Sequence, residues 1–322
     1  MTAILSIFQW LARFALLFVL FVALFMAGST AVAGLMPADS LSEPGLLSAT
    51  SGLLIIAQAN VFLIAALILT SRWGGWRLAL SLALAWFGAV TFVMQIETGY
   101  FLSSITVSPQ LLPRLFVMGM PTAFLFIPLA VWILGKGKAE TATLPPPALS
   151  MPARQWLWKL AAAAALYILL YWGAGYFIAW QNPALRAFYG QPGDALPFFT
   201  HTANTLRDDP WLFPFQVLRA LLWVLCALLV IRGSKVNVWW TALLVGLLFS
   251  VPQNIGHILE NPLLPIASVR LSHLIETASS TFVFGLLVVW LFHRTHRSVG
   301  DLLGLNLAAA KAQKPILHTQ KV

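Results

Sequence analysis

Residues 53–69 read LLIIAQANVFLIAALIL and contain no charged side chain. A helix needs about 20 predominantly apolar residues to cross the hydrocarbon core of a bilayer. The stretch from Leu46 to Thr70 therefore predicts one membrane span. Seven further stretches have the same character: Ile7–Leu35, Leu78–Leu102, Leu111–Leu134, Trp156–Trp180, Trp211–Ile231, Val236–Leu259 and Leu271–Phe292. Unpaired backbone groups are costly in lipid, so we expect an all-α polytopic membrane protein of about eight transmembrane helices.

The overall composition agrees with this fold class. Of the 322 residues, 60% are hydrophobic and only 9% are charged, whereas soluble domains carry about 25% charged residues. The formal net charge of +9 does not indicate nucleic-acid binding, because the basic residues lie between the apolar runs and in the tail. Membrane lipids are the expected acidic partner. The single cysteine, Cys226, excludes a disulfide framework.

The distribution of charge predicts the orientation of the chain. One set of connections and the tail carry most basic residues, whereas the other set carries Asp39, Glu43, Asp194, Asp208 and Asp209. The positive-inside rule then places both termini in the cytoplasm of a multi-pass inner (plasma) membrane protein. Arg13, the following apolar run and Ala31-Val32-Ala33 resemble a secretory signal with its cleavage site. The run is long for a signal, and the duplication described next favours a permanent span.

Several rare residues recur at a spacing of 158 positions. Gln58 and Gln216, Gln95 and Gln253, and Trp132 and Trp290 are each related by this offset, since 216−58, 253−95 and 290−132 are all 158. Placement of tryptophan at membrane interfaces explains the last pair but not the intramembrane glutamines. We predict two parallel four-helix repeats related by a pseudo-twofold axis along the membrane normal.

This duplication divides the chain into four parts. Residues 1–135 form the first membrane repeat, and residues 136–155, with three consecutive prolines, form a cytoplasmic linker. Residues 156–292 form the second repeat, which contains a long outer loop at residues 181–210. Residues 293–322 form a basic cytoplasmic tail. A loop of this length is either a functional or partner-binding segment or a cap on the outer surface.

Polar side chains within the spans gather in the outer half of the membrane. Amides and ionisable groups in a span are expensive, and each is a functional hypothesis by default. We predict an outer-facing polar cavity between the repeats. Its binding groups would be Glu97, Arg219, His273 and Glu276, and its lining would comprise Gln58, Gln95, Gln216 and Gln253. Arg219 is the expected partner of Glu97 or Glu276.

Three functions are compatible with this pattern. The leading hypothesis is a transporter-like or permease-like protein that binds its substrate in the polar cavity. The first alternative is a membrane enzyme that uses a divalent metal as cofactor. Its ligands would be the two His-x-x-Glu pairs, because an imidazole and a carboxylate one helical turn apart can share an ion: His257 with Glu260, and His273 with Glu276. The second alternative is a structural or assembly subunit that docks a protein partner on loop 181–210.

A structural interpretation of the same polar residues also stands, because Gln, Asn and His commonly join neighbouring spans through hydrogen bonds. It explains Glu97, Arg219, His273 and Glu276 least well, since these lie deepest. The sequence contains no phosphate-binding GxxxxGK loop, no GxSxG nucleophile elbow and no HExxH zinc motif. Neither the substrate nor the coupling ion follows from the residues.

Overall fold

The computed structural model describes residues 2–37, 42–138, 151–296 and 298–304, and these residues fold into helices joined by short connections. Among these described residues, eight helical segments are long and apolar enough to cross a membrane, which confirms the predicted all-α membrane fold class. Their boundaries differ from the predicted ones by at most four residues, at Ala267 against Leu271. The Pro-rich part of the linker and most of the basic tail lie outside the described residues.

The first four spans are built from segments in the first half of the chain. Span 1 is α1 (Thr2–Ser29) with η1 (Thr30–Val32), and span 2 is α2 (Ala49–Leu69). Span 3 comprises α3 (Gly75–Trp86), the π-helical η3 (Phe87–Phe92) and α4 (Val93–Leu102). Span 4 comprises α5 (Leu111–Met118), the π-helical η4 (Pro121–Phe126) and α6 (Ile127–Ile133).

The second half supplies four more spans and the helices of the long loop. Span 5 is α7 (Ala153–Ala174) with the π-helical η5 (Gly175–Ala179), and the loop carries α8 (Pro183–Phe188) and α9 (Phe198–Asp208). Span 6 is α10 (Leu212–Gly233). Span 7 is α11 (Val238–Asn254) with η6 (Ile255–Ile258), span 8 is α12 (Ala267–Phe292), and α13 (Val299–Leu302) follows.

Local sequence accounts for several helix starts. The side chains of Ser48, Asn182 and Asn237 accept hydrogen bonds from backbone N–H groups of the first turns of α2, α8 and α11. These residue types are favoured N-caps because they satisfy donors that have no partner within the helix. The caps fix where two spans, α2 and α11, and one loop helix, α8, begin.

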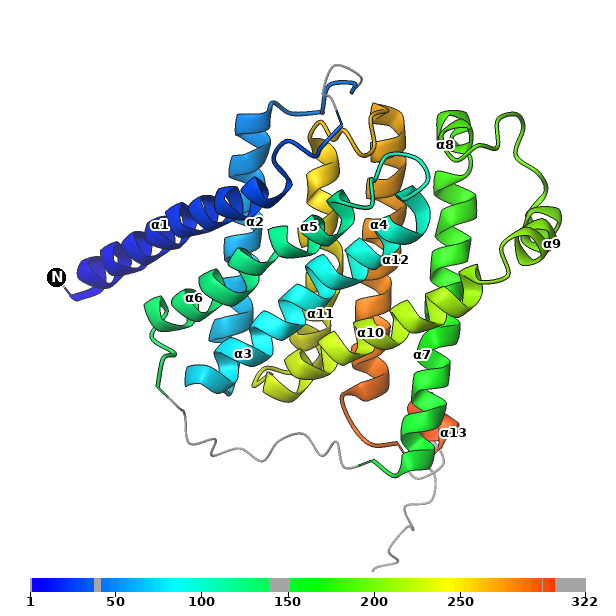
Figure 1. The fold of residues 1–322 in the computed structure, drawn as a ribbon. Coiled ribbons are helices and arrows are strands. Elements are labelled where there is room, and N and C mark those ends of the chain that lie inside the picture. The colour runs from blue at the N-terminus through cyan, green and yellow to red at the C-terminus, as the bar shows by residue number, and fades with distance from the viewer. Residues whose placement is uncertain (1, 38–41, 139–150, 297, 305–322) are drawn as a thin grey trace, which may run out of the picture.

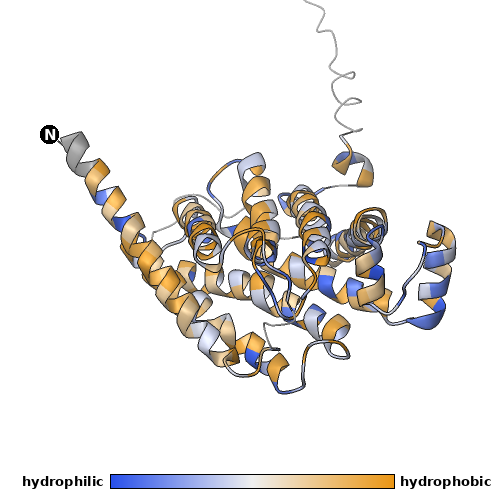
Figure 2. Cartoon of the chain, turned by 90° about the horizontal axis from the view of Figure 1, so that it is seen from above, coloured by the Kyte–Doolittle hydropathy of each residue, from blue (hydrophilic) through white to orange (hydrophobic). Residues whose placement is uncertain are grey.

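The spans pack in two layers of four (Figure 1). Helices α2, α11, α12 and α7 stand side by side in one layer. The other layer crosses it at a slant and contains α1, then span 4, then span 3, then α10. Figure 2, viewed from above, shows the upright helices end-on in a row. The core lies between the layers and includes Phe126, Trp223, Phe249 and Phe284, each with almost no exposed surface.

The closest pair of spans is α11 and α12. A Cβ atom added to Gly285 would lie 2.6 Å from Cα of Gly246 and 2.8 Å from its backbone nitrogen. Only glycine at both positions allows the two backbones to approach this closely, as is common between membrane helices. This contact fixes the position of α12, which carries His273 and Glu276.

Connections join one another at both ends of the bundle. At the lower end in Figure 1, Ser71 and Ser234 form an antiparallel bridge, and the Arg72 amide donates to the Gly233 carbonyl at 2.7 Å. At the upper end, the Thr106 hydroxyl donates to the Leu263 carbonyl at 2.9 Å. In each case the partners are connections that the 158-residue offset would make equivalent. The two-repeat arrangement itself remains a prediction.

Candidate functional site

A buried ion pair joins span 3 to span 6. The guanidinium of Arg219, on α10, donates to the carboxylate of Glu97, on α4, and also to the amide oxygen of Gln216 at 2.9 Å. Arg219 has 1% of its surface exposed and Gln216 has none, whereas the Glu97 side chain keeps 20%. Of the two charged side chains, only that of Glu97 is therefore accessible from the surface.

Aromatic rings surround the guanidinium of Arg219. The ring centres of Tyr167, Tyr171 and Phe215 lie 5.7–5.8 Å from its central carbon. A cation over aromatic faces gains electrostatic stabilisation that grows when water is excluded. Tyr167 and Tyr171 lie one turn apart on α7, so span 5 also contributes to the site. These rings hold the guanidinium in one position in front of Glu97.

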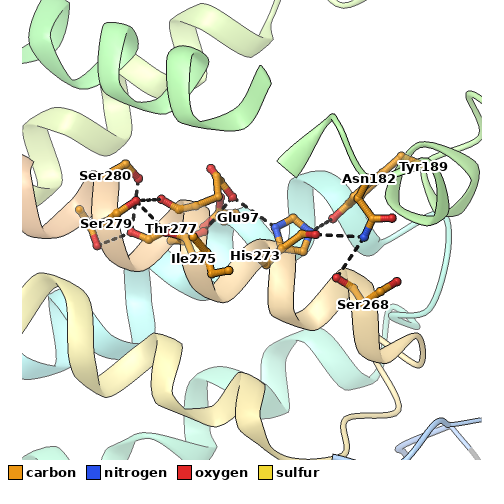
Figure 3. Close-up of polar contacts among 12 residues, drawn as sticks. Glu97, Asn182, Tyr189, Ser268, His273, Ile275, Thr277, Ser279 and Ser280 are labelled. Carbon is orange, nitrogen blue, oxygen red and sulfur yellow. Dashed lines mark hydrogen bonds and ion pairs between the residues drawn. The ribbon is translucent and has the colours of Figure 1, made fainter. Parts of the chain in front are cut away.

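A second group of polar side chains lies on α12. The carboxylate of Glu276 lies 3.4 Å from Nδ1 of His273 and accepts a hydrogen bond from the Thr277 hydroxyl at 3.0 Å. Nε2 of His273 lies 3.1 Å from the Tyr189 hydroxyl, which the loop after α8 supplies. In Figure 3, Tyr189 and Asn182 lie on one side of His273 along α12 and Thr277 lies on the other.

The two groups form one cluster. The charges of Glu276 and His273 both act on Glu97, and the charge of Glu276 acts on Arg219. Burial raises the pKa of Tyr189, outside the spans, and the charges of Glu97 and Glu276 raise it further. Glu97, Arg219, His273, Glu276 and Tyr189 therefore share one electrostatic environment, and we call these five residues the polar cluster.

Aromatic side chains at the ends of spans 3 and 6 contact one another and the long loop. Tyr100, at the end of α4, stacks on Phe215 with ring centres 4.3 Å apart, and its hydroxyl donates to Asp209 at 2.7 Å. Phe101 lies edge-on to both Phe215 and Tyr189. These contacts link the ends of spans 3 and 6 to the long loop.

The four predicted lining glutamines are not equivalent in the structure. Gln216 contacts Arg219 directly, as expected for a member of the site. The amide oxygens of Gln95 and Gln253 are buried and have no hydrogen-bond partner among the described residues. Gln58 is exposed and lies instead in a groove of about 360 Å³ between α1 and α2, lined by Phe14, Phe18, Leu54, Val61 and Phe62.

The candidate metal ligands are divided between two places. His273 and Glu276 are adjacent, and the His257 ring lies beside that of His273, with centres 6.3 Å apart and planes inclined by 29°. Glu260 is exposed in the connection after η6, where its charge acts on Arg270. Within the described ranges, no group of three or more His, Cys, Asp or Glu side chains is arranged to hold a metal ion. The metal hypothesis remains a prediction.

Sequence reasoning missed the tyrosines of the site. Tyr167 and Tyr171 share one helical face at a spacing of four, which is a signal that could have been read in the sequence. Tyr189 and Asp209 lie in the long loop, and only the folded chain brings them to α12 and α4.

A scan against protein-family models found no match, and searches of curated proteins and of solved structures found none either.

Proposed function

We propose that this protein is a transporter-like or permease-like membrane protein whose substrate binds at the polar cluster. The observation that carries the proposal is the convergence of ionisable groups from three separate spans: Glu97 on α4, Arg219 on α10, and His273 with Glu276 on α12. Packing between spans needs only neutral hydrogen bonds, whereas charges within a bilayer are rare and mark substrate or ion pathways. We propose that the upper end faces the cell exterior, because basic residues concentrate at the lower end.

The charge balance of the cluster favours a small organic cation. Two carboxylates, Glu97 and Glu276, face one arginine, and the hydrogen-bond partners of the Glu276 carboxylate among the described residues are His273 and Thr277. Phe101 lies edge-on to Tyr189 and Phe215, and these two rings contact His273 and Arg219, the partners of the carboxylates. Carboxylates with aromatic faces recognise protonated and quaternary amines. A protonated or quaternary amine would restore the charge balance that the excess carboxylate disturbs.

The first experiment is a thermal-shift comparison on the full-length protein in detergent. Choline, putrescine, tetramethylammonium, acetate and succinate serve as probes at equal concentration. A ligand that binds only the folded state raises the melting temperature, by an amount that grows with its concentration relative to Kd. We expect at least one amine to raise it, and we expect Glu276→Gln to abolish that shift.

The matched control is Asp208→Asn, which neutralises an exposed carboxylate of the long loop that pairs only with its neighbour Arg207 among the described residues. The amine-induced shift should survive this change. Transport is then measured by uptake of the active amine into proteoliposomes. A shift that persists in both Glu97→Gln and Glu276→Gln, or no shift with any probe, would contradict binding at the polar cluster.

A further inference from the structure

We infer that α9 lies in the membrane interface and inserts an apolar face into the lipid leaflet at the upper end of the bundle. This inference is independent of the proposed transport function, because it concerns only how the long loop meets the bilayer. It rests on three observations: the depth at which α9 is held, the apolar side chains that α9 exposes, and the lipid-facing surface that these side chains continue.

Contacts with span 5 fix the depth of α9. The Trp172 indole N–H donates to the Thr202 hydroxyl at 2.9 Å, and the Trp172 ring stacks on His201 with centres 5.1 Å apart and nearly parallel planes. Trp172 lies seven residues before Ala179, the last residue of the span. At 1.5 Å per residue this is about 10 Å below the end of the helix. Figure 1 accordingly shows α9 beside the upper part of α7 rather than above it.

An aromatic cage anchors the inner face of α9. The rings of Trp172, Tyr176 and Trp180 all lie within 5.5 Å of the His201 ring, measured between centres, and His201 is buried. Burial among these rings lowers the pKa of His201, so the imidazole stays neutral near pH 7. The inner face of α9 is therefore held firmly, and the helix cannot be treated as a free loop segment.

A second face of α9 is apolar and uncovered. Phe199, Ala203 and Leu206 follow one line on the helix at spacings of four and three, and Phe199 has 83% of its surface exposed. Leu206 is 52% exposed, and Trp211, just after α9, is 73% exposed. A third face carries Thr200, Asn204 and Arg207. Separate apolar and polar faces on one helix are typical of interfacial helices.

The apolar face continues the lipid-facing side of span 5. Phe177 is 64% exposed on η5, and its ring stacks on Phe198 of α9 with centres 5.3 Å apart. In the most apolar stretch of span 5, which contains η5, 17% of the residues are buried, and this is the smallest share among the eight spans of the described residues. Its exposed side chains must therefore meet lipid. Figure 2 shows α9 at the edge of the molecule, outside the row of upright helices.

The test is a site-specific fluorescence measurement in liposomes of phosphatidylcholine. The only cysteine, Cys226, is buried, so Cys226→Ala gives a background in which Phe199→Cys or Leu206→Cys can be labelled with an environment-sensitive dye. The matched control is Arg207→Cys on the polar face of the same helix. We expect nitroxide-labelled lipid to quench the dye at residues 199 and 206 several-fold more strongly than at residue 207, and aqueous iodide to show the opposite order.

Two results would overturn the inference. If iodide quenches residue 199 as strongly as residue 207, the apolar face lies in water. If both quenchers fail at residues 199 and 206, protein covers the face, as a second copy of the chain or another partner would. Both sites are exposed in the structure, so labelling should not disturb the fold, and elution as a single species from gel filtration checks this for each variant.

Discussion

Arg219 and Arg270 are buried to the same extent, about 1% exposed, yet they are satisfied by opposite kinds of partner. Arg270 donates to four backbone carbonyls, of Leu264, Pro265, Glu43 and Pro44, at 2.7–3.0 Å. Arg219 donates to side chains, the carboxylate of Glu97 and the amide of Gln216. Burial alone therefore does not distinguish the two arginines, whereas the chemistry of their partners does.

The difference has a physical consequence. Backbone carbonyls cannot change charge or leave, so Arg270 permanently ties the connection before α2 to the connection before α12. A carboxylate on another span can exchange its partner for a ligand. The Nε atom of Arg219 is buried and has no hydrogen-bond partner among the described residues, which leaves one donor of the guanidinium unused. The interactions of Arg219 are incomplete, whereas the terminal nitrogens of Arg270 each have two acceptors.

Removal of the carboxylate partner of Arg219 should have the largest effect. Glu97→Gln leaves a buried guanidinium without a counter-charge, and breaking a buried pair in this way costs about 3 kcal/mol or more. We expect a lower midpoint of denaturation in detergent than for the wild type. Arg219→Met added to Glu97→Gln should recover much of the loss. If the double variant is less stable than the single one, the Arg219–Glu97 pair does not account for the loss.

Exchange of each arginine for lysine separates the two sites. A lysine ammonium cannot reproduce the planar fork that reaches carbonyls of two connections. Arg270→Lys should therefore cost about 2 kcal/mol, equivalent to one lost hydrogen bond from a charged donor. Arg219→Lys keeps a positive charge beside Glu97 and should cost less. Chemical denaturation of both variants gives the comparison, and the reverse order would contradict our assignment of Arg270 as the structural residue.

Loss of the Tyr189 hydroxyl should have a smaller effect on stability. Tyr189→Phe removes one hydrogen bond to His273, which is worth about 1 kcal/mol. We expect a modest fall in melting temperature together with a weaker amine-induced shift, because the imidazole loses its orientation. Tyr176→Phe, which removes a hydrogen bond to the Leu196 carbonyl away from the cluster, is the control. Equal effects of the two changes on the amine-induced shift would argue against a role for Tyr189 in the site.

His296 is a third buried basic residue, and one of its ring nitrogens, Nδ1, has no hydrogen-bond partner among the described residues. Burial, aided by the charges of Lys159 and Arg294, lowers the pKa of His296 to about 4. The unfolded chain has a histidine pKa near 6.5. The unfolded state thus binds more protons, and stability should fall as the pH drops from about 6.5 toward 4.

The measurement for His296 is the melting temperature as a function of pH. We expect the decline between pH 6.5 and 4 to be shallower in His296→Gln than in the wild type. His201→Gln provides the comparison at the other end of the bundle, since burial lowers the pKa of His201 as well. A decline of unchanged steepness in His296→Gln would show that His296 does not contribute to the acid sensitivity.

The smallest expected effect is that of Glu260→Gln. Glu260 is exposed, so its neutralisation should change stability by no more than about 0.5 kcal/mol. The same variant tests the metal hypothesis. Metal content of the purified protein should be the same in Glu260→Gln as in the wild type. A stoichiometric metal that is lost in Glu260→Gln and in Glu276→Gln would instead place metal ligands both on the connection after η6 and on α12.

The fold class could be predicted because lipid imposes a simple rule on sequence. Residues 53–69 must be helical in a bilayer whatever they pack against, and the same holds for the other seven spans. The sequence predicts that Arg219 pairs with either Glu97 or Glu276, because a deep charge requires a counter-charge. The structure shows that the partner is Glu97. The different environments of the four glutamines were not predictable from spacing, since Gln58 and Gln216 differ in what their helices pack against.

The sequence by itself determined that the chain forms eight spans and that charged residues gather at one depth. The hydrophobicity and length of each apolar run decide how many spans form and how deep each residue lies. Both can be read from the local sequence. Only the tertiary structure decided that Arg219 pairs with Glu97, that Tyr189 returns to His273, and that Arg270 is satisfied by carbonyls. Each of these depends at least in part on a contact between residues more than eighty positions apart in sequence: Arg219 with Glu97, Tyr189 with His273, and Arg270 with the carbonyls of Glu43 and Pro44. Such contacts are set by how the helices pack rather than by the pattern along any one of them.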